Sequence, residues 1–194
     1  MDDRLSGMSR TGEDEHTGIG RYLYFSWLVV AAQIGVLLLL DRQWFCSCGS
    51  IHLWQGTLDP AQNSQQLTDP YSFLHFAFGC GLFLWLKSIR PHWHLARRAT
   101  YAVASSAIWE IVENLPFMIE IFGTEGSGLQ YSGDSIANSL GDTLIVLLGF
   151  LVASRLSTRW TVSAMLALEL TTFALIGDSM IAGLLRITAS SMMV

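Results

Sequence analysis

Between Tyr22 and Leu40 the chain carries an almost unbroken apolar run, with Gln33 as its only strongly polar residue. About twenty consecutive apolar residues are enough for a helix to cross the hydrocarbon core of a bilayer. The run is too long for the apolar core of a signal peptide, and no convincing small-residue cleavage site follows it. We therefore expect it to be retained as a first membrane span.

The composition favours the same class of protein. Hydrophobic residues make up 51% of the chain and charged residues only 14%, whereas about a quarter of a soluble domain is charged. The net charge of −5 and the lack of a basic patch with interleaved aromatics argue against a nucleic-acid partner. Cys46 and Cys48 are separated by one residue, which favours neither a relaxed disulfide nor a CxxC redox site. The expected partner is a lipid bilayer.

The chain is predicted to be all-α, a polytopic membrane helix bundle of about five transmembrane helices. The predicted spans are Tyr22–Leu40, Tyr71–Leu86, Ala99–Phe122, Asp134–Ser154 and Trp160–Ile176. Pro116 is expected to kink the third span and to free a backbone carbonyl. Residues 1–20 are polar and are predicted to be a disordered cytoplasmic tail. Residues 21–194 are predicted to form a single transmembrane domain, whose last part is a half-helix or an interfacial helix.

The positive-inside rule gives the orientation, because cytoplasmic loops are enriched in Lys and Arg. With the N-terminus inside, nine of the 11 Lys and Arg residues are cytoplasmic and only Arg42 and Arg186 fall outside. The prediction is a bacterial inner-membrane protein with a cytoplasmic N-terminus and a periplasmic C-terminus.

Two carboxylates interrupt the third predicted span. Glu110, Glu113 and Asn114 are spaced i, i+3 and i+4, so they share one helix face. Each ionised carboxylate at this depth costs roughly 2.5–3.5 kcal/mol on insertion scales. The topology brings further polar residues to the same outer half of the membrane: His75, Tyr131, Asp134, Asn138, Asp142 and Glu169. We expect these residues to form one outward-facing cluster.

Several carboxylates with one imidazole favour a hard or borderline divalent cation. The candidate metal ligands are His75, Glu110, Glu113, Asp134 and Asp142, and the candidate general bases are Glu113 and His75. The remaining cluster members are Asn114, Tyr131, Asn138 and Glu169. Two other interpretations stay open: a relay of protonated carboxylates, and a purely structural role in capping and helix packing.

Four stretches of the sequence carry a family resemblance: residues 46–56, 63–72, 109–116 and 131–142. With them the chain resembles an uncharacterised, mainly alphaproteobacterial family of multi-pass inner-membrane proteins, catalogued only as a domain of unknown function. Leu115 stands where that family usually has Ser, and residues 177–180 match its Arg-Asp-Asn-Leu only loosely. More distantly, the chain is similar to VanZ-like proteins, which implies a role in the cell envelope.

These observations leave two main functional hypotheses. The first is a metal-assisted membrane enzyme that faces the envelope and acts on an amphipathic or lipid-linked substrate. The alternative is a non-enzymatic transporter, or an accessory subunit with a membrane-protein partner. No sequence motif among HExxH, GxSxG and the Walker loop is present to specify a reaction.

Overall fold

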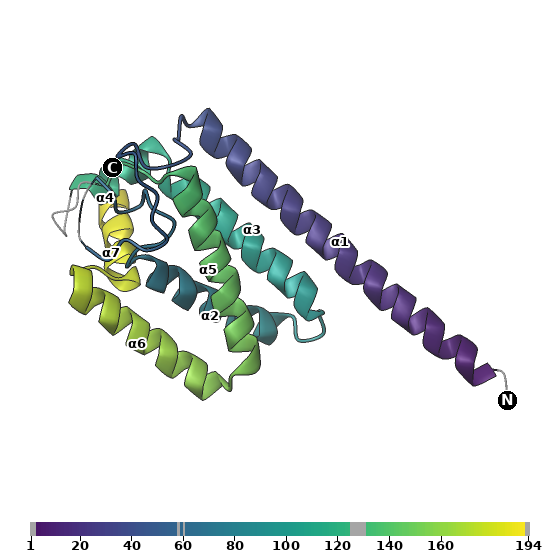
Figure 1. Ribbon diagram of the computed structural model, residues 1–194. Coiled ribbons are helices and arrows are strands. Elements are labelled where there is room, and N and C mark those ends of the chain that lie inside the picture. Colours follow the sequence, from purple (N-terminus) through teal and green to yellow (C-terminus); the bar gives the residue numbers. More distant parts are fainter. Residues whose placement is uncertain (1–2, 58, 60, 125–130, 193–194) are drawn as a thin grey trace.

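The computed structural model describes residues 3–57, 59, 61–124 and 131–192, and these residues form seven helices and no strand (Figure 1). The all-α class predicted from the sequence is confirmed. The helices are α1 (Asp3–Leu39), α2 (Ser72–Ile89), α3 (Leu95–Glu113), α4 (Pro116–Thr124), α5 (Ile136–Arg155), α6 (Thr158–Ile176) and α7 (Met180–Ser191).

Four helices in the described part of the chain are long and apolar enough to cross a membrane: Gly18–Leu39 within α1, and α2, α5 and α6. They coincide with four of the five predicted spans. The third predicted span corresponds to α3 and α4. The 19 residues of α3 include Arg97, Arg98, Glu110 and Glu113, and α3 is not among the four apolar helices, so its role as a fifth span stays a prediction.

The helix break at Pro116 is sharper than the predicted kink. α3 ends at Glu113, and Pro116 is the first residue of α4, a position where its missing N–H costs nothing. The carbonyl of Val112, which Pro116 cannot bond, instead accepts the N–H of Leu115 at 3.1 Å. The break therefore leaves this backbone group satisfied.

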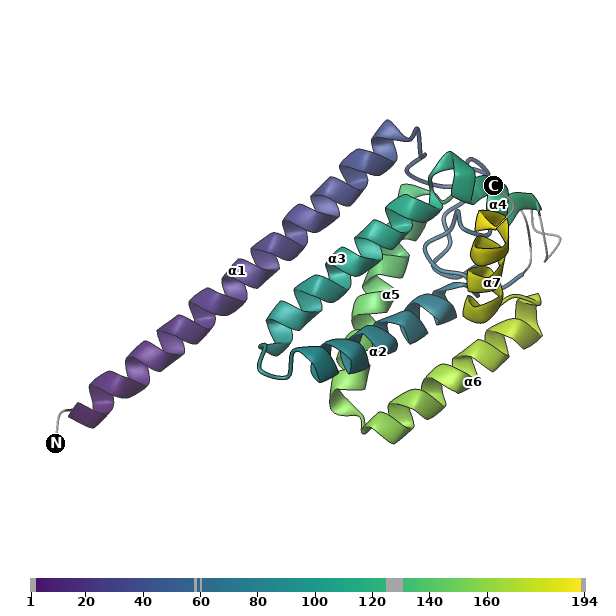
Figure 2. The ribbon, with the colours of Figure 1, turned by 180° about the vertical axis from the view of Figure 1, so that it is seen from behind.

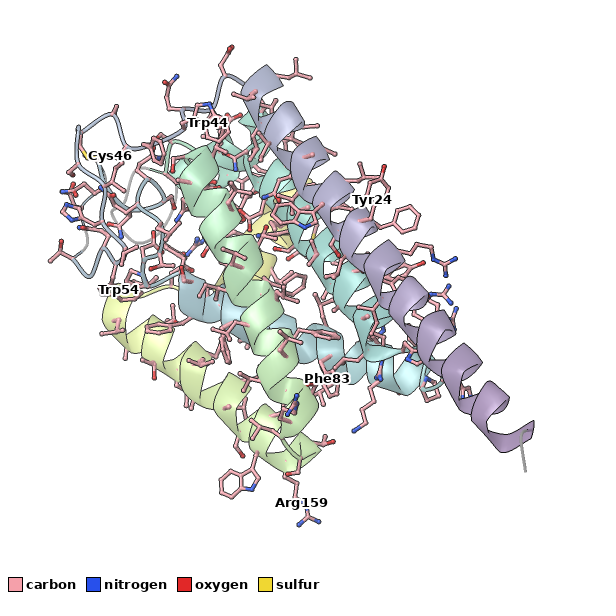
Figure 3. The ribbon with its side chains drawn as sticks, turned by 45° about the vertical axis from the view of Figure 1, so that its right-hand side comes forward. Tyr24, Trp44, Cys46, Trp54, Phe83 and Arg159 are labelled. Carbon is pink, nitrogen blue, oxygen red and sulfur yellow. A yellow bond between two sulfur atoms is a disulfide. The ribbon has the colours of Figure 1, made fainter. Side chains whose placement is uncertain are left out.

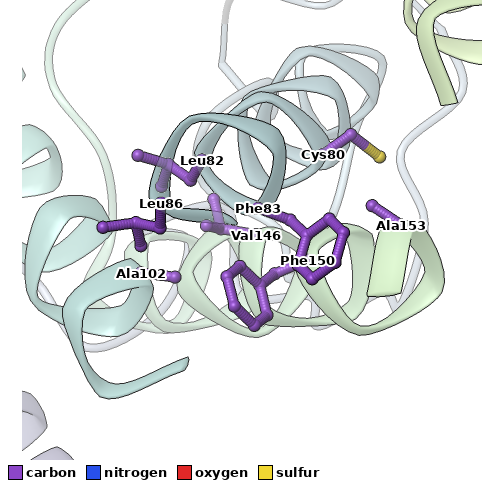
Figure 4. Packing of buried hydrophobic residues seen from close by; sticks show 8 residues of the cluster. All are labelled: Cys80, Leu82, Phe83, Leu86, Ala102, Val146, Phe150 and Ala153. Carbon is purple, nitrogen blue, oxygen red and sulfur yellow. The ribbon is translucent and has the colours of Figure 1, made fainter. Parts of the chain in front are cut away.

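The bundle is built around the crossing of α2 and α5 (Figures 1 and 2). α3 packs against α5, α1 lies along the outer side of α3, and α6 packs on α2. Between α2, α3 and α5 lies an apolar core (Figure 4): Cys80, Leu82, Phe83, Leu86, Ala102, Val146, Phe150 and Ala153. The rings of Phe83 and Phe150 meet edge to face with centroids 5.4 Å apart.

Two glycines allow α2 and α5 to approach closely. A Cβ atom on Gly79 would lie 2.0 Å from the carbonyl oxygen of Val146, and one on Gly149 would lie 2.2 Å from that of Phe76. Small residues at helix contacts serve this purpose in membrane proteins. The crossing fixes the relative positions of both ends of the two helices.

The first helix contributes one buried polar contact to the bundle. Gln33 is fully buried, and its amide nitrogen donates to the carbonyl of Ser139 at 3.3 Å and to the hydroxyl of Thr143 at 3.2 Å. The single polar residue of the first apolar run thus joins α1 to α5 and leaves no orphaned amide in the membrane.

The N-terminal tail, which the sequence predicts to be disordered, is helical in the structure from Asp3 onward. It continues as part of α1 and extends beyond the other helices (Figures 1 and 2). Propagation from an existing helix needs no new nucleus, so a span can carry such an extension. The division of the chain into residues 1–20 and 21–194 stays a prediction.

The loop between α1 and α2 covers the beginning of α5. Gln43 and Trp44 accept the backbone N–H groups of Ile136 and Ala137 at 2.8 and 3.1 Å. Cys46 and Cys48 are joined in a disulfide, a pairing that their spacing did not favour. In Figure 3, Trp44 and Cys46 lie at this end of the bundle and Arg159 lies at the opposite end.

Candidate metal centre

A cavity of about 300 Å³ opens beneath the loop, between the beginnings of α2 and α5, the end of α3, and α4 and α7. Its apolar lining residues include Leu74, Phe78, Trp109, Phe122 and Leu184. The predicted cluster members that line it are His75, Glu113, Tyr131, Asp134, Asn138 and Asp142. Glu110 and Asn114 are buried beside it.

His75 lies between two carboxylates. Its Nδ1 is 3.4 Å from Oε1 of Glu110, and its Nε2 is 3.7 Å from Oδ2 of Asp142. One potential ligand atom from each of His75, Glu110 and Glu113 lies within 4.8 Å of the others. The structure therefore brings together three of the five predicted metal ligands, with Asp142 on the far side of the imidazole.

Glu110 is the least satisfied polar group of the cluster. Its side chain is fully buried, and neither carboxylate oxygen accepts a hydrogen bond of good geometry within the described residues, although the hydroxyl of Ser139 lies near it. Burying a charged carboxylate without a partner costs several kcal/mol. The carboxylate therefore carries a proton, is paired with a protonated His75 at 3.4 Å, or has a partner from outside the chain.

The carboxylate of Asp142 is held in place by a hydrogen bond from Ser72. One of its oxygens accepts the hydroxyl of Ser72 at 2.6 Å, and the other faces the His75 ring. A carboxylate behind a histidine fixes the tautomer and orientation of the ring, as is usual for histidines that bind metals. The geometry gives Asp142 a positioning role toward His75.

Asp134 is the centre of a second group of contacts. Its Oδ2 accepts Nδ2 of Asn114 at 2.6 Å and the hydroxyl of Tyr131 at 2.9 Å, and its N–H donates to Oδ1 of Asn114 at 2.8 Å. The carboxyl group of Glu113 lies within hydrogen-bonding reach of Asp134. Burial raises the pKa of Tyr131 well above its ordinary value, so its hydroxyl stays a donor.

The remaining two predicted cluster members have local structural contacts. Asn138 donates to the carbonyl of Gln66 at 2.8 Å and so ties the loop to α5. Glu169 does not line the cavity; its carboxylate accepts the N–H groups of Met180 and Ile181 at 3.1 and 3.0 Å. It therefore caps the beginning of α7, where a negative charge is favourable.

Sequence reasoning missed an ion pair at the cavity. Arg186 of α7 binds Asp178 through both terminal nitrogens, at 2.7 and 2.9 Å, and both residues line the cavity. The two residues are eight positions apart, with a helix start between them, so no simple periodicity pairs them.

Asp69 closes the loop side of the site. Its carboxylate accepts the N–H groups of Ser64 at 2.7 Å and Tyr71 at 2.8 Å. Burial raises the pKa of Asp69 to about 6, although these N–H groups oppose the shift. An acidic residue directly before a proline, here Pro70, is typical of the beginning of a helix.

The fold and the site define a protein with several candidate membrane spans and a buried group of carboxylates around one histidine. The chain belongs to the family described as protein of unknown function DUF2585, whose model matches residues 37–190. The predicted membership in an uncharacterised family with alphaproteobacterial homologues is thereby confirmed.

Several relatives support this assignment. A UPF0314 protein of Sphingopyxis alaskensis is 37% identical over 88% of this chain and 85% of its own length. Another, from Brucella anthropi, is 38% identical over 84% of this chain and 82% of its own length. UPF0314 protein R03235 of Rhizobium meliloti is 39% identical over 78% and 77%. No solved structure matches the chain.

Proposed function

We propose that this protein binds a divalent cation through His75, Glu110 and Glu113 and uses it to act on an amphipathic or lipid-linked molecule at the outer face of the inner membrane. The observation that carries the proposal is the buried Glu110 carboxylate, neither of whose oxygens has a hydrogen-bond partner of good geometry in the described chain. A bound cation supplies that partner and offsets the cost of burial.

The distances support this assignment. Two ligand atoms held about 2.1 Å from one metal at a tetrahedral angle lie about 3.4 Å apart. Nδ1 of His75 and Oε1 of Glu110 are 3.4 Å apart. If Nδ1 of His75 bound the cation, its Nε2–H would face Asp142 at 3.7 Å, and the three groups would match the carboxylate–histidine–metal arrangement typical of protein sites.

The other acidic residues suit proton transfer. A bound divalent cation polarises an oxygen of the substrate or makes water more acidic. Asp134 lines the cavity and lies within hydrogen-bonding reach of Glu113, so its carboxylate would accept the proton released by a water activated at the site. Asn114 and Tyr131 hold Asp134 in position for that role.

The cavity wall indicates the substrate class. Leu74, Phe78 and Trp109 line the cavity together with the acidic residues. A molecule with a hydrocarbon portion and a polar reacting group matches this mixed lining. The distant resemblance to VanZ-like proteins favours the same envelope setting and stays a prediction.

The experiment is incubation of purified protein with a bacterial polar-lipid extract, with and without Mn²⁺ or Zn²⁺, followed by mass spectrometry of the lipids. We expect a metal-dependent change in lipid species that Glu113→Gln abolishes. Asp41→Asn, which alters an exposed carboxylate outside the cavity, should leave it intact. If the metal-loaded wild type and Glu113→Gln leave the same lipid profile, the enzymatic assignment is wrong.

The contact between Glu113 and Asp134 also supports a second candidate, a transporter driven by protons. Two buried carboxyl groups within hydrogen-bonding reach share a proton readily. In liposomes, this alternative predicts flux that depends on a proton gradient, persists in metal-free wild type and is lost in Glu113→Gln. The enzymatic proposal predicts no such flux.

A further inference from the structure

A second cavity lies at the other end of the same three helices. Its volume is about 360 Å³, and three of its lining residues are basic: Lys87 in the last turn of α2, Arg98 in the first turn of α3 and Arg155 at the end of α5. The other lining residues are Phe83, Pro91, Leu95 and Ser154. None of the described lining residues is acidic.

The three cations are not neutralised by neighbouring side chains. Within the described part of the chain, none of them forms a salt bridge or donates a side-chain hydrogen bond. The Nε of Arg98 is buried and has no hydrogen-bond partner there. A buried guanidinium donor without an acceptor is under-satisfied, and an anion bound in the adjoining basic cavity would supply acceptors to this side chain.

Two of these cations, Lys87 and Arg98, lie over the aromatic ring of Phe83. Nζ of Lys87 lies 5.6 Å from the centre of this ring, and Cζ of Arg98 lies 5.7 Å from it. Both side chains therefore lie next to the same aromatic ring. The neighbouring Arg90 and Arg97 instead lie over Trp93, at 5.5 and 3.9 Å, and neither lines the cavity.

We propose that this cavity binds a phosphate group, with Lys87, Arg98 and Arg155 as its ligands. Two Arg side chains and one Lys suit a phosphate, because guanidinium groups bind its oxygens in pairs and ammonium adds charge. The hydroxyl of Ser154 already donates to the carbonyl of Leu151 at 2.6 Å, so the cations supply the donors. Basic pockets between membrane helices bind anionic lipid headgroups in the same way.

The positive-inside rule alone explains basic residues at this end of the bundle, but it does not explain their convergence. Arg97 and Arg159 satisfy that rule without lining the cavity. They are therefore matched controls. A general attraction to an anionic surface depends on all of these residues alike, whereas a phosphate site depends on the three that line the cavity.

The test is a titration of full-length, detergent-purified protein with phosphatidylglycerol, followed by native mass spectrometry of the first bound lipid. We expect Arg98→Gln and Arg155→Gln each to weaken binding by about tenfold, the loss typical of one charge-assisted contact. Arg97→Gln and Arg159→Gln should weaken it by no more than a few-fold. Arg155 is exposed at a helix end, so its variant is expected to fold.

A second arm distinguishes the source of the phosphate group. Millimolar inorganic phosphate that displaces phosphatidylglycerol, in competition that Arg155→Gln abolishes, identifies a free phosphate compound as ligand. Lipid binding that phosphate does not affect identifies a lipid headgroup. If the cavity variants and the control variants weaken lipid binding equally, and phosphate does not bind, the proposal is wrong.

Discussion

The two ends of the helices α2, α3 and α5 carry charges of opposite sign, and these charges differ in how deeply they are buried. At one end the carboxylate of Glu110 is fully buried, whereas at the other Lys87 and Arg155 reach outward from helix ends. His75 and Lys87 are twelve residues apart on α2, or about 18 Å along the helix, and the apolar core of Figure 4 lies beside the helix between them.

This difference shows what burial adds to charge. Long basic side chains keep water around their charged groups at little cost, so three cations alone do not require a ligand. The observation that favours one is the buried Nε of Arg98, which has no acceptor in the described chain. A fully buried carboxylate has no such freedom. The acidic end therefore implies a partner more strongly than the basic end does.

The largest effect on stability is expected at the close contact between α2 and α5, because this contact positions both ends of the two helices. In Gly79→Ala, the new methyl group would meet the carbonyl of Val146 at 2.0 Å and force α2 and α5 apart. We expect a loss of about 3 kcal/mol in the free energy of unfolding, at the upper end for overpacking. Gly35→Ala, with nothing within 4 Å, should be neutral or stabilising. Equal stability of the two variants in detergent would contradict the observed crossing.

A pH effect is expected at the acidic end. The pKa of Asp69 is about 6 in the folded chain and 3.8 in the unfolded reference. A raised pKa means that the folded state holds the proton more tightly, so the stabilisation is present below pH 4 and lost as pH rises through 6. We expect roughly 2–3 kcal/mol. Unfolding curves of wild type and Asp69→Asn between pH 4 and 7 should diverge by this amount; parallel curves would refute it.

A smaller effect is expected for the residue behind the histidine. Asp142→Asn removes the charge that orients His75 and should weaken metal binding by about 10- to 100-fold, as for other groups behind metal ligands. Competition with a metal-binding dye measures this change. Glu169→Gln, at a carboxylate that caps α7 outside the cavity, is the control and should leave the affinity unchanged.

The smallest effect expected is coupling between the two ends. Because the two cavities are far apart and share no partner, effects of distant variants should add within about 0.5 kcal/mol. Glu110→Gln should leave phosphatidylglycerol binding unchanged, and Arg155→Gln should leave metal binding unchanged. The double variant should show both single effects. A larger coupling would mean that the ends form one functional unit.

The predictable part of this fold follows from local patterns. The length of the apolar runs was enough to find α1, α2, α5 and α6, because a helix that crosses a bilayer must satisfy its backbone internally. The spacing of Glu110, Glu113 and Asn114 placed them on one helix face. A common depth in the membrane then predicted that His75 and Asp142 lie near them, as the structure has it.

The rest depends on contacts that no local pattern encodes. Glu169 has the depth of a cluster member, yet α7 folds back so that its N–H groups meet this carboxylate. The pairing of Asp178 with Arg186 arises from the same turn. The basic cavity combines the ends of α2 and α5 with the beginning of α3, and the sequence alone indicated only that these residues set the topology.

The central claim is that a cation is the missing partner of Glu110. Elemental analysis of detergent-purified wild type beside Glu110→Gln tests it most directly, with Arg155→Gln as a control from the opposite end of the bundle. We predict a near-stoichiometric divalent metal in wild type and in Arg155→Gln, and its loss in a folded Glu110→Gln. A folded wild-type protein that holds no metal, even after dialysis against Mn²⁺ or Zn²⁺, would contradict the claim.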